Sequence, residues 1–596
     1  MEKKQSKALK GGEFLVRETE AKDIFIPGEF SEEQLMIAQT CQDFINRVVI
    51  PETDRIDSQE EGLLPSLLDQ AGELGLLGVS VPEEYGGFGQ DFITSMLSTE
   101  MIGASGTFAV AFATHTGIGT LPILYYGNND QKKKYLPGLA TGAIKGCYCL
   151  TEPNAGSDAN AGRTKAVLSK DKKYYTLNGQ KMWITNSGFA DLFIVFAKIG
   201  DDKNLSAFIV EKGYKGIKLD AEEKKMGIKG SSTRQVFFND CKVPAENLLG
   251  ERDGGFKIAM YILNIGRIKL AAAALGAAKD IIGKSVSYAN ERVQFGQVIS
   301  GFGAIKYKLA EQAVRAFACE SALYRCSQNV DDAISSLINS GMDNEKATLE
   351  GIRQFATEAA IMKVFGSEIL DYVVDEGVQI YGGMGYSAEM PMDRAYRDSR
   401  INRIFEGTNE INRLLVVDML LRRALKGEID IMGPAMAVGK ELMSIPDLGD
   451  DSDELFYREK KYVRNLKKAI LMVAGAAAQK FMQKLEHEQE IITNISDMII
   501  QLYIAESNLL RVEKLVSIKG EDTCKIQLDM MKVFINDAVD RVNKAGKDAI
   551  YSFAEGDEQR IMLMGLKRFT KTTPFNIKEA RRNIADKLIE ENKYCF

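Results

Sequence analysis

One carboxylate in this chain has neighbours that suit the removal of a proton. Glu406 follows the apolar pair Ile404-Phe405 and precedes Gly407. A carboxylate held among apolar side chains gains proton affinity and can act as a general base, and a glycine lets the backbone approach a ligand closely. The alternative is a solvated surface charge, because most glutamates stay exposed. The role of Glu406 therefore depends on what the rest of the chain supplies.

Two segments before it could contact a flat ring. Residues 148–158 gather small hydroxyl groups and backbone amides around Pro153 and Gly156, which suits hydrogen bonding to a heteroaromatic ligand, although any polar loop offers such groups. Residues 182–186 contain Trp183, the only tryptophan of the chain. A single tryptophan is more often a core anchor than a platform for a ligand. Neither segment is specific alone.

Two further segments could contact phosphate groups. Residues 291–296 place Arg292 and Phe295 at the end of a predicted helix, where the arginine could pair with a diphosphate or cap the helix carbonyls. Residues 379–386 form a glycine-rich turn whose amides could approach a phosphate, although it lacks the lysine of a phosphate-binding loop.

Composition limits the possible chemistry. The 596 residues include 76 Lys and Arg against 83 Asp and Glu, a net charge of -7, so no general positive field for nucleic acid is expected. Only His115 and His487 are histidines, which nearly excludes paired imidazoles or a multi-histidine metal site, and we expect no metal. A lone histidine such as His115 is more often a satisfied core group than a ligand.

Cysteine usage and the N-terminus bear on the compartment. The eight cysteines lack the spacing of a disulfide framework or a zinc site, which favours free thiols in a reducing compartment. The first five residues are polar and lack the apolar run of a signal peptide. The sequence has no stretch of about 18 consecutive apolar residues, so a membrane-spanning helix is not expected. We expect a cytoplasmic protein, with association to the inner membrane surface as an open possibility.

Hydrophobic periodicity predicts an α+β multidomain protein. After an extension (1–30) come a helical domain (31–150), a barrel-like middle domain of antiparallel strands (151–255) and a four-helix bundle that carries Glu406 (256–429). Asn178-Gly179 predicts a hairpin turn. An acidic linker (430–458) then leads to a separate helical tail domain (459–596). Residues 431–443 are apolar at helical spacing but have few cations, which favours core packing over membrane binding.

The order of these motifs resembles the acyl-CoA dehydrogenase family over residues 31–425. The forms Thr151-Glu152-Pro153 with Gly156-Ser157-Asp158, and Phe405 to Glu410, are the most specific. The extra helical tail is similar to the very-long-chain branch in length and helical character. The resemblance implies FAD as cofactor and oxidation of an acyl-CoA to a trans-2-enoyl-CoA in fatty acid β-oxidation.

The resemblance also implies roles for individual residues. Glu406 matches the catalytic base, whose own N–H and a flavin ribityl hydroxyl polarise the thioester carbonyl. Some members place the base near Asn264 to Arg267 instead, where this chain has Gly266. FAD would contact Tyr148, Leu150, Thr151, Gly156, Ser157, Trp183, Ile184, Thr185, Arg292, Gln294, Phe295, Gln379, Gly382, Gly383, Thr408 and Glu410. Substrate would contact Ser157, Asn264, Arg267, Phe405, Gly407, Val110 and Thr114.

Three consequences follow from the resemblance. Arg292, Gln294 and Phe295 match a cluster that reaches the FAD of a neighbouring subunit, so a homodimer is expected. Val110 and Thr114 stand where medium-chain members have polar residues that floor the acyl pocket, which favours long acyl chains, although very-long-chain members tend to have glycine there. Electrons would pass to an electron-transfer flavoprotein; an acyl-CoA oxidase that uses oxygen, and an assembly factor for respiratory complexes, are the alternatives.

Overall fold

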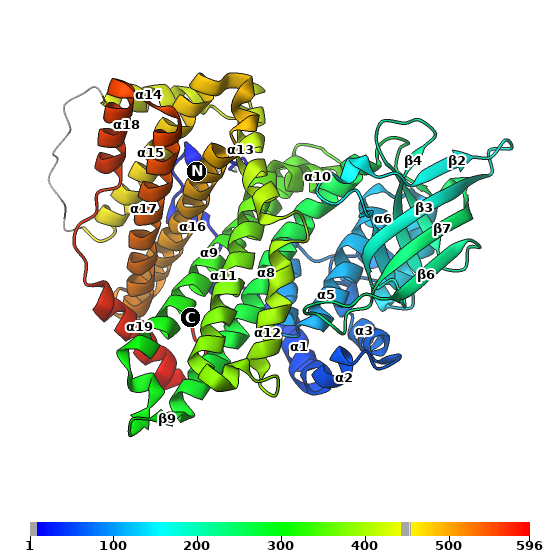
Figure 1. Ribbon diagram of the computed structural model, residues 1–596, viewed down its shortest axis with the longest axis horizontal. Helices are drawn as coiled ribbons and strands as arrows, with labels where there is room; N and C mark the ends of the chain where they lie inside the picture. The colour runs from blue at the N-terminus through cyan, green and yellow to red at the C-terminus, as the bar shows by residue number, and fades with distance from the viewer. Residues whose placement is uncertain (1–8, 443–451, 453) are drawn as a thin grey trace.

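The computed structural model describes residues 9–442, 452 and 454–596, and its parts follow the predicted order of helices, sheet and helices (Figure 1). The α+β multidomain class is confirmed. Two predictions fall on residues outside this range: the start of the extension at 1–8, and most of the acidic run at 447–454.

Short helices form the first domain. The first of them starts after Ser31, whose hydroxyl accepts a hydrogen bond from the Gln34 amide at 3.1 Å in a capping box. The fourth and fifth lead into a π-helical turn that faces the cavity described below. The elements are α1 Glu32–Phe44, α2 Thr53–Asp57, α3 Leu63–Glu73, α4 Phe92–Gly103, α5 Thr107–Ala113, η8 Thr114–Gly119, α6 Leu121–Tyr126 and α7 Asn129–Thr141.

The middle domain is a sheet of eight strands in the order β6-β7-β3-β2-β4-β5-β8, with β1 beside β4. Most neighbours are antiparallel, but β1 and β2 both run parallel to β4, so the sheet is mixed rather than wholly antiparallel. Buried side chains such as Phe193, Phe208 and Phe238 fill its interior. The strands are β1 Gly146–Cys149, β2 Lys165–Leu168, β3 Tyr174–Thr185, β4 Leu192–Ile199, β5 Ser206–Glu211, β6 Ile217–Glu222, β7 Thr233–Pro244 and β8 Leu248–Leu249.

The hairpin predicted at Asn178-Gly179 is wrong. Both residues lie inside β3, where the register to β7 shifts between Leu177 and Gly179, as at a β-bulge. A Cβ on Gly179 would lie 2.8 Å from Thr164 Cα, so the glycine serves a close backbone approach. The turn between β2 and β3 is made instead by residues 169–173.

Long helices build the bundle. α8 spans Gly255–Glu291. Arg267 therefore lies inside a helix rather than at its first turn. The other helices are α9 Gly303–Asn339, α10 Asn344–Gln354, α11 Ala356–Tyr381, α12 Pro391–Ser399 and α13 Asn409–Leu425.

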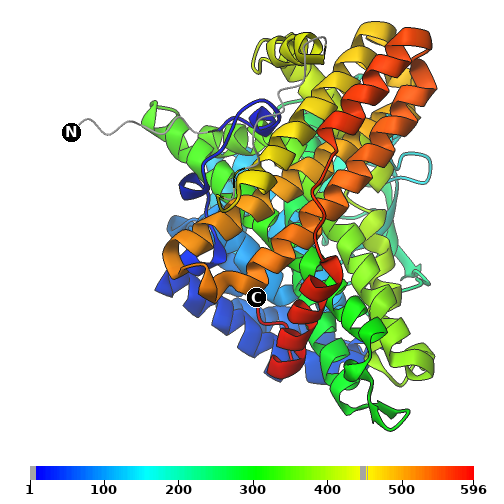
Figure 2. The same cartoon turned by 90° about the vertical axis from the view of Figure 1, so that its left-hand side faces the viewer.

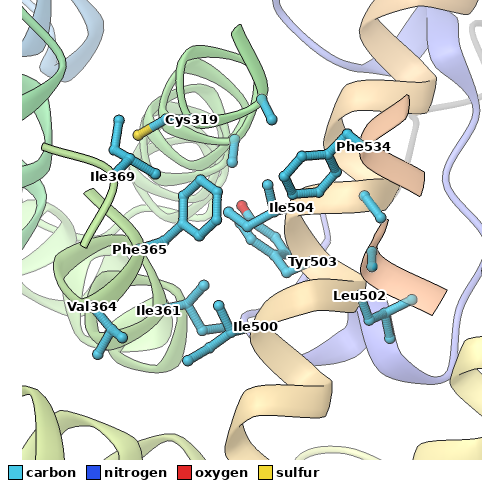
Figure 3. Packing of buried hydrophobic residues seen from close by; sticks show 14 of the residues in the cluster. Cys319, Ile361, Val364, Phe365, Ile369, Ile500, Leu502, Tyr503, Ile504 and Phe534 are labelled. Atoms are coloured by element: carbon cyan, nitrogen blue, oxygen red, sulfur yellow. The ribbon is translucent and has the colours of Figure 1, made fainter. Parts of the chain in front are cut away.

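The tail forms six helices that lie against the bundle (Figure 2). One continuous buried cluster contains residues of both regions, so the tail domain packs on the bundle through a shared core. Figure 3 shows the contact: Phe365 of α11 faces Phe534 of α17, with ring centroids 6.0 Å apart, and Tyr503 and Ile504 of α16 belong to the same cluster. The helices are α14 Met432–Leu442, α15 Tyr457–Phe481, α16 Gln489–Lys519, α17 Lys525–Phe553, α18 Gly556–Phe569 and α19 Ile577–Glu591.

The described part of the N-terminal extension joins bundle and tail. Phe14 is buried in the shared core and its ring lies 4.8 Å from that of Tyr503. The Gly12 amide donates to Glu358 of α11 at 2.6 Å, and Lys467 of α15 donates to the Arg17 carbonyl at 2.7 Å. The extension is thus part of the folded core.

Two helical stretches are long and apolar enough to cross a membrane by composition. They are Thr107–Tyr126 and Gly255–Glu291, and 83% and 72% of their most apolar windows are buried inside the protein. Such burial is typical of core helices.

Candidate functional site

A cavity of about 470 Å³ lies where the first domain, the sheet domain and the bundle meet. η8 and α5 form one wall, the ends of β1 and β3 a second, and α8 with the loop before α13 a third. The predicted residues that line it are Val110, Thr114, Tyr148, Leu150, Thr151, Gly156, Ser157, Trp183, Ile184, Thr185, Arg267, Phe405, Glu406 and Gly407.

Glu406 occupies this wall in a strained conformation. Its φ is 58°, in the left-handed region that residues with a Cβ rarely adopt. Its Oε2 atom is buried and has no hydrogen-bond partner among the described residues. Burial raises the pKa of Glu406 to about 7, while the charges of Arg267 and Lys363 oppose that rise. The geometry therefore presents a carboxylate suited to general base chemistry.

Gly266 explains why this carboxylate fits. A Cβ at that position would lie 2.9 Å from Glu406 Oε2 and 3.0 Å from its Cδ, closer than ordinary contact. The glycine, which the resemblance places where other members carry their base, thus faces Glu406 directly. Only one of the two positions can hold an acid in this arrangement.

Side chains at the start of α13 hold the loop around Glu406. Asn412 Nδ2 lies 2.8 Å from the Gly407 carbonyl and 3.0 Å from that of Thr408. The Thr408 hydroxyl accepts from the Ile411 amide and caps α13. Nothing in the described part of the chain accepts a hydrogen bond from the Glu406 amide, so this N–H is available to a ligand in the cavity.

Arg267 closes the other side of the loop. Its Nε donates to the Glu406 carbonyl at 3.3 Å, and a second guanidinium nitrogen donates to Asn264 Oδ1 at 2.8 Å. Burial lowers the pKa of Arg267 to about 10. Asn264 does not line the cavity; it orients the arginine that does.

The opposite wall fits the ring system of FAD. The Tyr148 hydroxyl is buried without a partner among the described residues. Beside Gly156, a Cβ would meet no atom within 4 Å, which leaves open space at the cavity wall. Trp183 is 52% exposed with φ 60°, so it is not the core anchor that a single tryptophan usually is.

Nine residues that the resemblance assigned to FAD or substrate do not line the cavity. They are Asn264, Arg292, Gln294, Phe295, Gln379, Gly382, Gly383, Thr408 and Glu410. Arg292 ends α8, 25 residues after Arg267, which at 1.5 Å per residue puts the two about 37 Å apart. Phe295 is 95% exposed. The last turn of α8, just before this segment, lies beside the 379–383 turn, since Tyr288 and Tyr381 stack with centroids 3.9 Å apart.

Lys363 is the main group that the sequence did not reveal. It lies on α11, fully buried, and donates to Asn409 Oδ1 at 2.7 Å next to the Glu406 loop. The signal was a single lysine inside the apolar run Ala359 to Phe365.

The interpretation of His115 as a core group is confirmed. Its Nε2 contacts the Leu139 carbonyl at 2.8 Å, and its Nδ1 accepts from the Gly146 amide at 3.1 Å. Burial lowers the pKa of His115 to about 4, so the ring is neutral. Within the described ranges no group of three or more potential ligands could hold a metal ion, and all eight cysteines are free.

Four family models cover the chain: the acyl-CoA dehydrogenase N-terminal domain at residues 31–143, the middle domain at 147–241, and two C-terminal domain models at 253–421 and 465–568. The chain belongs to the acyl-CoA dehydrogenase family, and it is an FAD-dependent acyl-CoA dehydrogenase.

Three relatives illustrate the similarity. A probable acyl-CoA dehydrogenase of Bacillus subtilis is 44% identical over 595 residues, the full length of both chains. The human mitochondrial very long-chain specific enzyme is 36% identical and covers 91% of this chain and 84% of its own. A crystal structure of an acyl-CoA dehydrogenase complexed with FAD from Bacillus anthracis superposes with a TM-score of 0.96 at 47% identity, covering 99% and 100% of the two chains.

Proposed function

We propose that this enzyme oxidises long-chain acyl-CoA thioesters with Glu406 as the base. The observation that supports this role is a carboxylate oxygen without a partner, on a cavity wall, beside a backbone amide that is free to donate.

In this proposal each group of the wall has a task. The Glu406 N–H donates to the thioester carbonyl, which acidifies the α-hydrogens. The Glu406 carboxylate takes one of these protons, and Arg267 holds the loop in place through the Glu406 carbonyl. FAD, when bound, supplies the acceptor for the β-hydrogen as hydride. Tyr148, Thr151 and Trp183 would hold its ring system.

The length of the acyl chain is inferred from a second cavity. This cavity, of about 410 Å³, shares Ala109, Val110, Ala273 and Asn402 with the first, so the two adjoin. Most of its wall is apolar, with Ala274, Ala277, Ile281, Leu370 and Val374 among its members. Val110 lines both cavities and so stands at their boundary. In this proposal, an acyl chain that fills the first cavity extends past Val110 into the second.

A chain-length series tests this substrate preference. Anaerobic titration of the purified yellow protein should reduce its flavin faster with a sixteen-carbon than with an eight-carbon acyl-CoA. A faster reaction with eight carbons would overturn the long-chain assignment and leave the family assignment intact.

We further propose that an electron-transfer flavoprotein, the partner that the family uses, reoxidises the flavin. The reduced enzyme should then react slowly with oxygen and rapidly with the purified flavoprotein. A rapid reaction with oxygen would instead favour the oxidase alternative.

A homodimer is proposed because residues 292–295, Gln379, Gly382 and Gly383 are exposed and lie away from the cavity of their own chain. The stacked rings of Tyr288 and Tyr381 hold these two segments near each other. In a dimer, Arg292 and Gln379 would meet the FAD of the second chain. Sedimentation should give twice the monomer mass, and Arg292→Ala should weaken FAD retention. A monomer that binds FAD fully would contradict this assembly.

A cytoplasmic location is proposed from the free cysteines, with membrane-surface association as the alternative. In α14, Val438 is buried, while Met432 and Met436 are 65% and 61% exposed. Co-sedimentation with liposomes, with and without residues 430–460, separates the two.

A further inference from the structure

Lys363 is a fully buried lysine for which no carboxylate lies within salt-bridge distance among the described residues. Among the described residues, its one hydrogen bond is the 2.7 Å donation to Asn409 Oδ1. A buried ammonium group costs folding free energy unless it is paired. Burial accordingly lowers the pKa of Lys363 to about 8. Stability alone does not explain a lysine here.

Its position relative to α13 makes the lysine still less favourable for stability. Asn409 is the first residue of α13, so the ammonium group lies at the helix N-terminus. The helix dipole is positive at that end and disfavours a cation. An apolar side chain of similar length would avoid both costs.

Lys363 is instead well placed to fix the loop that carries Glu406. Asn409, 3% exposed, also donates through Nδ2 to Ser367 Oγ at 3.0 Å and to Glu368 Oε1 at 3.1 Å. α11 thus clamps the first residue of α13, three positions after Glu406. The clamp and the Asn412 contacts hold the backbone that keeps Glu406 in its left-handed conformation.

The charges around this pair are few. Glu406 is the strongest charge that favours ionised Lys363, with Arg267 of α8 opposing and Glu410 and Glu368 adding smaller favourable effects. Arg267 and Lys363 are in turn the two cations that oppose the raised pKa of Glu406. Across the cavity, the Tyr148 phenol also interacts with the Glu406 charge.

We propose that Lys363 is a positioning residue of the reaction: it clamps the Glu406 loop through Asn409 and supplies a second positive charge behind the base. This inference rests on the proposed role of Glu406. The lysine does not line the cavity and therefore acts through Glu406 rather than on the substrate.

The test compares Lys363→Met with Lys363→Arg in the FAD-loaded enzyme. Loss of a nearby opposite charge typically moves a carboxyl pKa by one unit or more. We expect Lys363→Met to move the acid limb of the kcat/KM profile upward by about one pH unit, with a roughly fivefold loss at pH 7 that largely recovers at pH 9. Lys363→Arg should keep the limb in place.

Controls separate this role from a structural one. Lys467→Met removes another buried lysine, which contacts Glu506 of the tail and the Arg17 carbonyl of the N-terminal extension, and should leave the profile unchanged. A loss of activity in Lys363→Met that is equal at every pH would show that the lysine only supports the fold and would overturn the proposal. Glu406→Gln tests the base itself: if that variant turns over normally, the proposed function fails first.

Discussion

Replacing Gly266 with alanine should slow the reaction without weakening the fold. The new methyl carbon would lie 2.9 Å from Glu406 Oε2, whereas ordinary contacts begin near 3.4 Å, so the carboxylate must move by roughly half an ångström. A misplacement of 1 Å at a reacting group costs about a hundredfold in rate. We therefore expect kcat to fall roughly tenfold.

The free energy of unfolding should change little in Gly266→Ala. Alanine in a helix interior is favoured over glycine by about 0.5–1 kcal/mol, and Gly266 lies inside α8. The contact with Glu406 offsets part of that gain. The free energy of unfolding of Gly266→Ala should thus stay within about 1 kcal/mol of the wild-type value.

The same helix offers a matched control. A Cβ on Gly283 would meet no atom within 4 Å, so Gly283→Ala gains helix propensity without touching Glu406. Stopped-flow reduction of the flavin by a long-chain acyl-CoA, together with denaturant unfolding, measures both effects. A Gly266→Ala enzyme with the wild-type rate, or one slowed only as much as Gly283→Ala, would refute the reasoning.

Three further substitutions test the site. Glu406→Gln should abolish turnover. Because burial raises the pKa of Glu406 from 4.5 to about 7, the free energy of unfolding of the wild type should fall relative to this variant as pH rises through that range. Denaturant titrations at pH 5 and 8 should show a difference of up to ~3 kcal/mol. Val110→Gln should narrow the boundary between the two cavities and lower the sixteen-carbon to eight-carbon ratio of flavin reduction at least about tenfold, and an unchanged ratio would place the acyl chain elsewhere. Arg394 pairs with Asp57 at 2.8 Å and with Asp54 at the outer wall of the second cavity, so Arg394→Ala should raise relative rates with chains beyond sixteen carbons a few-fold and leave the eight-carbon rate unchanged.

Much of the site was predictable because its chemistry depends on short segments. Trp183 and Thr185 are close in sequence, as are Phe405 and Glu406, so their residue types and spacing can be recognised without knowing the fold. The structure brings these segments to one cavity. Lys363 was not predictable in the same way, because its meaning depends on which face of α11 meets the first turn of α13.

The error at Asn178-Gly179 has the same origin. Asn178-Gly179 has the composition of a hairpin turn, but Thr164 approaches it across the sheet and makes it a bulge. The apolar stripes of the tail helices are equally compatible with a core of their own and with one shared with the bundle, and only the packing distinguishes the two.

The contacts between the N-terminal extension and the tail determine when, during synthesis of the chain, this region can fold. Lys514 Nζ donates to the Ile24 carbonyl across 490 residues of sequence, and Lys467 reaches Arg17 across 450. At about 5–20 residues per second, a ribosome needs roughly 25–100 s to make the partner of a segment that it has already released. Phe14 must therefore wait in the nascent chain with its apolar surface uncovered. The contacts of this region can therefore form only after Lys514 has been synthesised.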